Sequence, residues 1–169
     1  MQYRFLMLLL LLIQGCTLQP VKPESVSSQG VPDVWQTQGR MSISSDTHRQ
    51  SYQFDIGFDH DNYQIKLSAP LGLAAVEIVS DNQQIRVNNQ VIDMSLTQWL
   101  EEELGWSFPL ETLAEIIFQP QVVNLKDWQI DIIKYQTIES FRYPKILRLK
   151  HQNQAIKIKL LISKVNQLK

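Results

Sequence analysis

The sequence predicts a mainly β protein, with an antiparallel sheet of about eight or more strands interrupted by two short helices. Three observations lead to this prediction. Apolar residues alternate with polar ones over several consecutive segments, short polar clusters separate these segments, and two stretches near the middle have helical spacing instead.

The alternation is clearest in two neighbouring segments, residues 52–58 and 63–68. Each therefore predicts a strand with one apolar face and one solvated face. The polar cluster at 59–62 separates them, and a connection this short requires antiparallel neighbours. Later polar clusters extend the series, so the first half of the chain is expected to form successive strands at about 34–45, 50–59, 62–69, 74–80 and 84–88.

Two amphipathic helices are expected after these strands. Ser95 is placed to cap the first, with Gln98 three residues on as its capping-box partner and Gly105 as the stop. Pro109 suits the first position of the second helix, and Pro120 follows its end. The strand pattern then resumes around residues 128–132, 146–150 and 156–162.

The N-terminal segment resembles a bacterial secretion signal. An apolar run from Phe5 to Ile13 follows Arg4, and Cys16, the single cysteine, is separated from that run by two residues. The stretch Leu12-Ile13-Gln14-Gly15-Cys16 resembles a lipobox, which implies cleavage before Cys16 and lipidation of its thiol. An ordinary signal peptide with a chance cysteine, or a short uncleaved anchor, are the alternatives.

The expected organisation is a signal peptide at 1–15, a lipidated cysteine and flexible tether at 16–33, and one folded domain at 34–169. The tether is rich in proline and serine and poor in apolar residues, so it is not expected to join a core. Thr17 is not the aspartate that retains lipoproteins of this type at the inner membrane. The outer membrane, on its periplasmic face, is therefore the expected location.

Composition and motifs argue against several function classes. The formal net charge is −1, without the clustered basic sequence typical of nucleic-acid binding. The three histidines do not share a metal-ligand spacing, and neither a phosphate-binding glycine loop nor a G-x-S-x-G nucleophile motif is present. We therefore expect no catalytic residues, no metal and no cofactor.

The connection between the third and fourth expected strands is unusually apolar. It contains Pro70, Leu71, Gly72 and Leu73, whereas turns are normally polar. One interpretation is that the leucines fold back onto the core. The other is that a leucine at the tip contacts lipid, which would contribute about 1.5 to 3 kcal/mol, enough to orient a loop but not to anchor the protein.

Several of these features together resemble the LolB family of outer-membrane lipoprotein receptors. They are listed in chain order: the lipobox, the proline-rich tether, Trp35, Gly39-Arg40, Tyr63, Pro70-Leu71-Gly72, the helix pair around Pro109-Leu110 and Leu113, and the closing strand Ile156-Lys157-Ile158-Lys159. The resemblance implies an open antiparallel half-barrel of about 8 to 11 strands with a helical lid, a count in keeping with the alternating segments.

The resemblance also implies a function without a cofactor. A protein of this family accepts acylated lipoprotein cargo from a periplasmic LolA-like carrier and inserts it into outer-membrane phospholipid, with the leucine equivalent to Leu71 exposed for that step. We expect a monomer, with no nucleic-acid partner. The competing interpretation is an envelope lipoprotein that binds a protein partner or acts as a scaffold.

Inward-facing positions of the expected strands and helices are candidate walls of an acyl-chain cavity. They are Tyr52, Phe54, Ile56, Tyr63, Ile65, Leu67, Val76, Ile78, Leu100, Leu113 and Ile117. Alternation identifies which residues face inward, but a filled core would have the same pattern. The sequence leaves both possibilities open.

Overall fold

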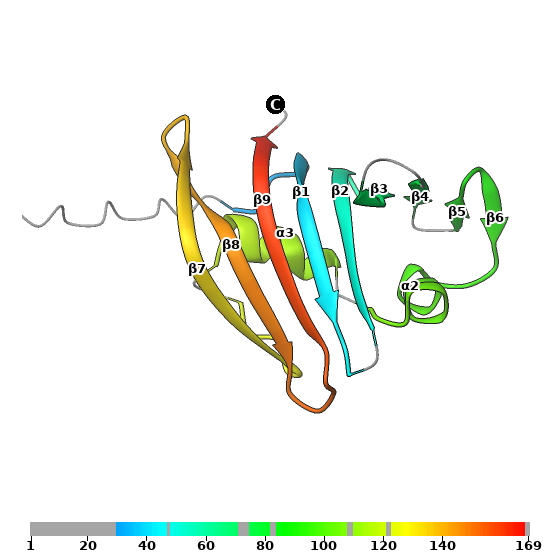
Figure 1. The fold of residues 1–169 in the computed structure, drawn as a ribbon. Coiled ribbons are helices and arrows are strands. Elements are labelled where there is room, and N and C mark those ends of the chain that lie inside the picture. Colours follow the sequence, from blue (N-terminus) through cyan, green and yellow to red (C-terminus); the bar gives the residue numbers. More distant parts are fainter. Residues whose placement is uncertain are drawn as a thin grey trace, which may run out of the picture.

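The computed structural model of the protein describes residues 30–46, 48–70, 75–81, 84–107, 110–120 and 123–167. These residues form a nine-stranded antiparallel sheet and two helices, as Figure 1 shows. The strands are β1 (Val34–Ser44), β2 (Arg49–Asp59), β3 (Asn62–Ser68), β4 (Ala75–Ser80), β5 (Ile85–Val87), β6 (Gln90–Ile92), β7 (Trp128–Ile138), β8 (Phe141–His151) and β9 (Lys157–Gln167).

The sheet is open. Its strand order is β6-β5-β4-β3-β2-β1-β9-β8-β7, so β6 and β7 are the two edges. The first six strands follow one another as a meander, the last three form a second meander, and the two are joined where β9 pairs with β1. The prediction of a mainly β, open antiparallel fold is confirmed.

One face of the sheet is apolar because the strands are in register. Ile56 lies opposite Ile65, and Ile65 lies opposite Ile78, so an apolar row crosses β2, β3 and β4. The alternate residues of these strands face solvent. Both helices cover the apolar face.

The two ends of the sheet differ in what they connect. At one end, Ser44 pairs with both Arg49 and Lys157, and Ser68 pairs with Ala75. We call this the loop end, because the β1–β2, β3–β4 and β8–β9 connections leave the sheet there; Figure 1 shows the β1–β2 and β8–β9 hairpins side by side at the bottom. The opposite end is called the tether end, because β1 begins there, with Val34 paired to Asp59.

Helix α2 (Leu96–Leu104) has the ends that the sequence predicts. The Ser95 side chain accepts a hydrogen bond from the Gln98 backbone N–H, and the Gln98 side chain accepts one from the Ser95 backbone N–H. Gly105 ends the helix with a φ of 73°, a left-handed conformation that glycine adopts without steric cost.

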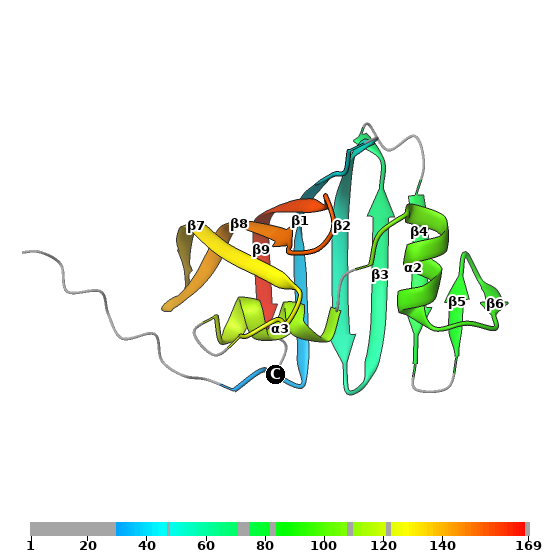
Figure 2. The ribbon, with the colours of Figure 1, turned by 90° about the horizontal axis from the view of Figure 1, so that it is seen from below.

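Helix α3 (Leu110–Phe118) follows after a short linker, and Pro120 comes just beyond its end, as predicted. The predicted first-turn proline, Pro109, lies outside the described residues. In Figure 2, α3 lies against the side of the sheet formed by β8, β9 and β1, whereas α2 lies on the β4 side. Each helix therefore covers a different half of the apolar face.

Candidate functional site

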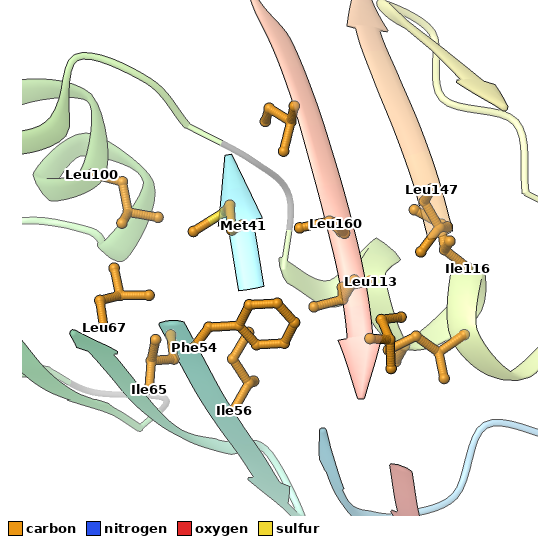
Figure 3. Packing of buried hydrophobic residues seen from close by; sticks show 14 of the residues in the cluster. Met41, Phe54, Ile56, Ile65, Leu67, Leu100, Leu113, Ile116, Leu147 and Leu160 are labelled. Carbon is orange, nitrogen blue, oxygen red and sulfur yellow. The ribbon is translucent and has the colours of Figure 1, made fainter. Parts of the chain in front are cut away.

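A narrow apolar slot lies between the sheet and the two helices. Figure 3 shows Leu100 of α2 and Leu113 of α3 facing apolar side chains of the sheet. The slot is lined by Met41, Phe54, Ile56, Ile65, Leu67, Leu100, Trp106, Leu113, Ile158 and Leu160. These residues are all apolar or aromatic, and the sheet members span the middle of the strands, with Met41, Ile158 and Leu160 toward the loop end.

The slot is almost closed. Its volume is about 40 Å³. A single water occupies about 30 Å³ in the liquid, and pockets that hold small organic ligands usually measure about 300 to 1,000 Å³. In this conformation the concave face is therefore mainly a packed core, with a small void at its centre.

The structure brings together six of the residues that the sequence suggests as cavity walls. Phe54, Ile56, Ile65, Leu67, Leu100 and Leu113 all line the slot. Ile78 and Ile117 are fully buried in the surrounding core and are not among the lining residues. Tyr52, Tyr63 and Val76 are half-buried and pack against the margin of the core.

Four lining residues are additional to that set. Met41 on β1, and Ile158 and Leu160 on β9, follow the same alternation as the predicted residues, but their position opposite the helices depends on the pairing of β1 with β9. Trp106 lies in the linker between the helices. A lone aromatic residue in a short linker has no periodicity that would identify it.

Trp106 is the one lining residue with a buried polar atom that lacks a partner. Its side chain is 6% exposed, and its indole Nε1–H has no hydrogen-bond partner. Leaving a buried donor unsatisfied costs about 1 to 3 kcal/mol. The slot therefore contains a hydrogen-bond donor that is not used in the closed state.

A cluster of aromatic rings holds the C-terminal end of α3 near the tether end. Phe118 makes edge contacts with Trp35 and Tyr143, with 5.9 Å between ring centroids in each case. Phe58 extends the cluster from Trp35 to Tyr63. Such ring pairs contribute about 0.5 to 1.5 kcal/mol each beyond their buried area. The C-terminal end of α3 is thus attached to the sheet by ring contacts near the tether end.

The two helices are attached to the sheet mainly by apolar side chains. Their inward-facing residues include Trp99, Leu100, Leu113, Ile116 and Ile117, all buried. Among the described residues, the backbone hydrogen bonds of α2 and α3 are internal to the helices and their caps, and none joins a helix backbone to a strand. Outward movement of the helices would therefore break apolar contacts but no backbone hydrogen bonds of the sheet.

Two tyrosines near the apolar face have shifted acidities. Burial raises the pKa of Tyr52, whose hydroxyl donates to Gln50 Oε1 at 3.0 Å. Burial also raises the pKa of Tyr143, whose oxygen accepts a hydrogen bond from Gln167 Nε2 at 3.0 Å. Both hydroxyls are therefore neutral at physiological pH and bonded at the margin of the apolar region.

The remaining predicted site residues lie in or beside parts of the chain that the structure does not describe. Pro70 is exposed at the loop end, whereas Leu71, Gly72, Leu73 and the lipidation candidate Cys16 lie outside the described residues. Within the described ranges, no group of three or more His, Cys, Asp or Glu side chains is arranged to hold a metal ion. None of the described helices has the length and hydropathy required to span a membrane.

Sequence comparison shows which proteins this chain resembles. A family model described as outer membrane lipoprotein LolB matches residues 33–118. The outer-membrane lipoprotein LolB of Francisella tularensis subsp. tularensis is 26% identical over 146 residues, which cover 73% of this chain and 70% of the relative. The LolB of Aeromonas salmonicida is 23% identical, with 89% and 90% covered.

Among solved structures, a LolA superfamily protein from Nitrosomonas europaea is similar, with a TM-score of 0.48 and 9% sequence identity. The match covers 84% of this chain and 89% of that one.

Proposed function

This chain belongs to the LolB family of outer membrane lipoproteins, and we propose that it accepts acylated lipoproteins from a periplasmic carrier and inserts them into the outer membrane. The observation that carries the proposal is the slot, which is lined entirely by apolar and aromatic side chains and covered by two short helices. An acyl chain would enter by separating these helices from the sheet.

The physical need for such a site follows from the cost of exposing lipid to water. Moving an acyl chain of about 16 carbons into water costs on the order of 10 kcal/mol, at about 0.8 kcal/mol per CH₂, and a lipoprotein has up to three such chains. Release into the periplasm would therefore be very slow. Passage from one apolar site to another avoids this cost and requires no cofactor.

The closed slot supports a mechanism in which the helices move. With about 40 Å³ of free volume, the slot must widen roughly tenfold to reach the size typical of ligand pockets. The arriving acyl chain replaces the apolar contacts that the helices lose, so the net cost of opening is small. The aromatic cluster around Phe118 keeps the C-terminal end of α3 in place while α2 and the linker move.

Trp106 gives the open site one polar contact. Acyl chains of a lipoprotein are joined to glycerol or to the terminal amine through ester or amide carbonyl groups. We infer that the unpartnered indole N–H of Trp106 donates to one of these carbonyl oxygens, which would satisfy a donor left without a partner in the closed state. A net hydrogen bond of this kind contributes about 0.5 to 1.5 kcal/mol.

Delivery is assigned to the loop end. Pro70 is exposed there, and Leu71, in the connection that follows, is proposed to enter the bilayer as the cargo leaves the slot. Met41, Ile158 and Leu160 extend the slot toward this end, so the path from slot to membrane would be short.

The experiment that tests this function is transfer between proteins in solution. The mature chain, residues 16–169 with Cys16→Ser, is mixed with carrier loaded with a labelled triacylated lipoprotein, and each protein is captured by its own affinity tag. We expect the label to move to this chain. If the label stays on the carrier while this chain is folded and the carrier delivers to another acceptor, the proposed function is wrong.

The scaffold interpretation gains no support from the outer surface. Among the described residues, the large apolar side chains that are strongly exposed are Val91 and Ile133. They lie on β6 and β7, the two opposite edges of the sheet. Single exposed apolar residues are ordinary on soluble surfaces and do not form a docking patch.

A further inference from the structure

Five cations lie together on the outer face of the sheet at the loop end. On β9, Lys157 and Lys159 are exposed and alternate with buried apolar residues. On β8, Arg148 and Lys150 do the same, and Arg49 begins β2 nearby. We call these five residues the basic cluster: Arg49, Arg148, Lys150, Lys157 and Lys159. They surround an open depression of about 440 Å³.

The strand register places like charges directly opposite one another within this cluster. Arg148 lies across from Lys159, and Lys150 lies across from Lys157. Like charges in such cross-strand positions destabilise a sheet. One carboxylate, Asp131, lies across from Arg148, but the ion pairs found among the described residues involve none of the five cations. The cluster thus has a repulsion that an external anion would relieve.

The opposite end of the same sheet is acidic. Asp33, Asp59, Asp61, Asp81 and Glu139 lie at or beside strand ends there. Arg86 is close to Asp81, with 3.8 Å between Nη2 and Oδ2. Because the whole chain has a formal net charge of only −1, this separation is a property of where the charges are placed and not of the composition. Acidic side chains are therefore more numerous at the tether end and basic ones at the loop end, although Asp46 and Asp127 lie near the loop end and Arg142 near the tether end.

We propose that the basic cluster binds the anionic phospholipid headgroups of the membrane that receives the cargo, and so turns the loop end toward that membrane. This inference rests on the proposed function, since it concerns the delivery step. The cluster and the β3–β4 connection share the loop end, so electrostatic attraction at the cluster would bring Leu71 to the bilayer surface.

The distances suit this arrangement. At about 3.3 Å per residue, Lys159 and Arg148 lie roughly 7 to 10 Å from the ends of their strands. These lengths are comparable with the Debye length, which is about 8 Å at physiological salt and about 10 Å at 0.1 M. Arg49, Lys150 and Lys157, at the strand ends, would therefore interact most strongly with a charged surface at the loop end, and Arg148 and Lys159 less strongly.

The chemistry of the cluster favours a lipid surface over a protein partner. The centres of protein interfaces usually contain buried tryptophan, tyrosine or arginine anchors surrounded by packed residues. The basic cluster has no aromatic member, and its cations are exposed on a regular sheet face. Dispersed cations of this kind bind anionic lipid, with each contributing roughly a factor of five in affinity.

Vesicle binding by the unlipidated mature chain tests the proposal. The chain with Cys16→Ser is sedimented with vesicles of phosphatidylcholine alone, or with about a third phosphatidylglycerol, at low and high salt. We expect binding to require phosphatidylglycerol and to disappear at high salt. Lys157→Gln/Lys159→Gln should weaken it about thirtyfold, at about a factor of five per cation. The matched control, Lys134→Gln/Lys164→Gln, removes two exposed lysines elsewhere on the sheet and should have little effect.

Three outcomes would overturn the proposal. Binding that does not depend on phosphatidylglycerol would show that the anionic headgroup is not the ligand. An equal loss in both double variants would mean that only net charge matters. If the Lys157/Lys159 variant bound vesicles normally but no longer received cargo from the carrier without vesicles, the cluster would contact the carrier instead. Cargo transfer from the carrier is measured without vesicles, so a failure of the proposed function can be distinguished from a failure of membrane binding by the basic cluster.

Discussion

The ring of Phe118, the last residue of α3, meets the Trp35 ring of β1 edge-on, with 5.9 Å between centroids and an interplanar angle of 67°. Trp35 is fully buried and Phe118 is 7% exposed. This contact joins the end of the helix pair to the strand at the centre of the sheet. It lies at the tether end, beyond the slot residues, where it would fix one end of the helical cover.

Phe118→Ala should therefore weaken both the fold and the attachment of the helices. Removing a buried phenylalanine typically costs about 3 to 5 kcal/mol, so the urea midpoint should fall sharply. Hydrogen exchange of the α3 amides should increase more than that of the central strands. Ile133→Ala, at a position 50% exposed, serves as the control and should change stability by no more than about 0.5 kcal/mol. A loss below 1 kcal/mol for Phe118→Ala would contradict the anchoring role.

Gly39 is predicted to be sensitive to the smallest substitution. It lies at a β-bulge in β1, and a Cβ there would be 2.2 Å from the Leu161 carbonyl oxygen and 2.7 Å from the Phe54 ring. Because backbone must shift to admit a methyl group, Gly39→Ala should cost about 1 to 3 kcal/mol in unfolding free energy. The matched variant Gly57→Ala meets its nearest atom at 4.0 Å and should be close to neutral. If Gly39→Ala and Gly57→Ala changed the melting temperature equally, a steric clash at Gly39 would be excluded.

The bulge at Gly39 occurs where β1 pairs with β9, and this pairing is a feature that the sequence does not predict. Strict alternation over 52–58 and 63–68 predicted β2 and β3, and the capping residues Ser95, Gln98 and Gly105 predicted the limits of α2. These patterns involve only residues that are close in the sequence, so they predict local structure without knowledge of the tertiary contacts. The joining of the two meanders through β1 and β9 depends on pairing between distant residues, so no local sequence pattern predicts it.

Elements that break the alternation were missed or shortened. The register of β7 shifts around Ile132 and Lys134, so two consecutive residues there face solvent. The alternation of apolar and polar residues is therefore interrupted in the second half of β7. Strand β6 has only three residues, too few for a periodic signal. The predicted set of slot residues was incomplete because some positions depend on tertiary structure or have no periodic pattern. Met41 and Leu160 lie under the helices because of tertiary pairing, and Trp106 is in a linker.

Trp106→Phe should separate cargo binding from stability. The variant keeps an aromatic ring in the slot but removes the N–H donor. Affinity for acylated cargo should fall about two- to tenfold, corresponding to a hydrogen bond of about 0.5 to 1.5 kcal/mol. Trp35→Phe is the matched control, because it removes the other unpartnered buried indole N–H at a position that does not line the slot. The proposed contact is excluded if both variants bind a fluorescent triacylated peptide equally.

Leu71→Glu should block insertion without affecting cargo acceptance. A carboxylate in the β3–β4 connection opposes entry into hydrocarbon, and the variant loses the roughly 1.5 to 3 kcal/mol that burying the leucine would contribute. Transfer from carrier to this chain should proceed normally, while transfer onward to vesicles should fail. Leu71→Ile keeps an apolar residue of similar volume and should behave like the wild type. Normal delivery by Leu71→Glu would show that the loop does not enter the bilayer.

The length of the tether should limit delivery, because the segment that leads from the proposed lipid anchor joins β1 at the end of the domain opposite the loop end. Seventeen residues, 17–33, separate Cys16 from Val34 at the tether end. Val31 packs against the core, so at most residues 17–30 bridge the distance; fully extended they span about 46 Å, whereas the 11 residues of β1 rise about 36 Å. The wild-type tether is thus long enough for the loop end to turn back to the membrane that holds the lipid.

Deleting residues 20–29 leaves seven tether residues, which reach only about 23 Å, less than the length of the sheet. In lipidated protein reconstituted into vesicles, this deletion should abolish delivery into the same bilayer while leaving acceptance from the carrier intact. Replacing the same ten residues with glycine and serine preserves the reach and should preserve delivery. If the shortened protein delivers cargo at the normal rate, the loop end need not contact the membrane that holds the anchor, and the proposed orientation of the domain fails.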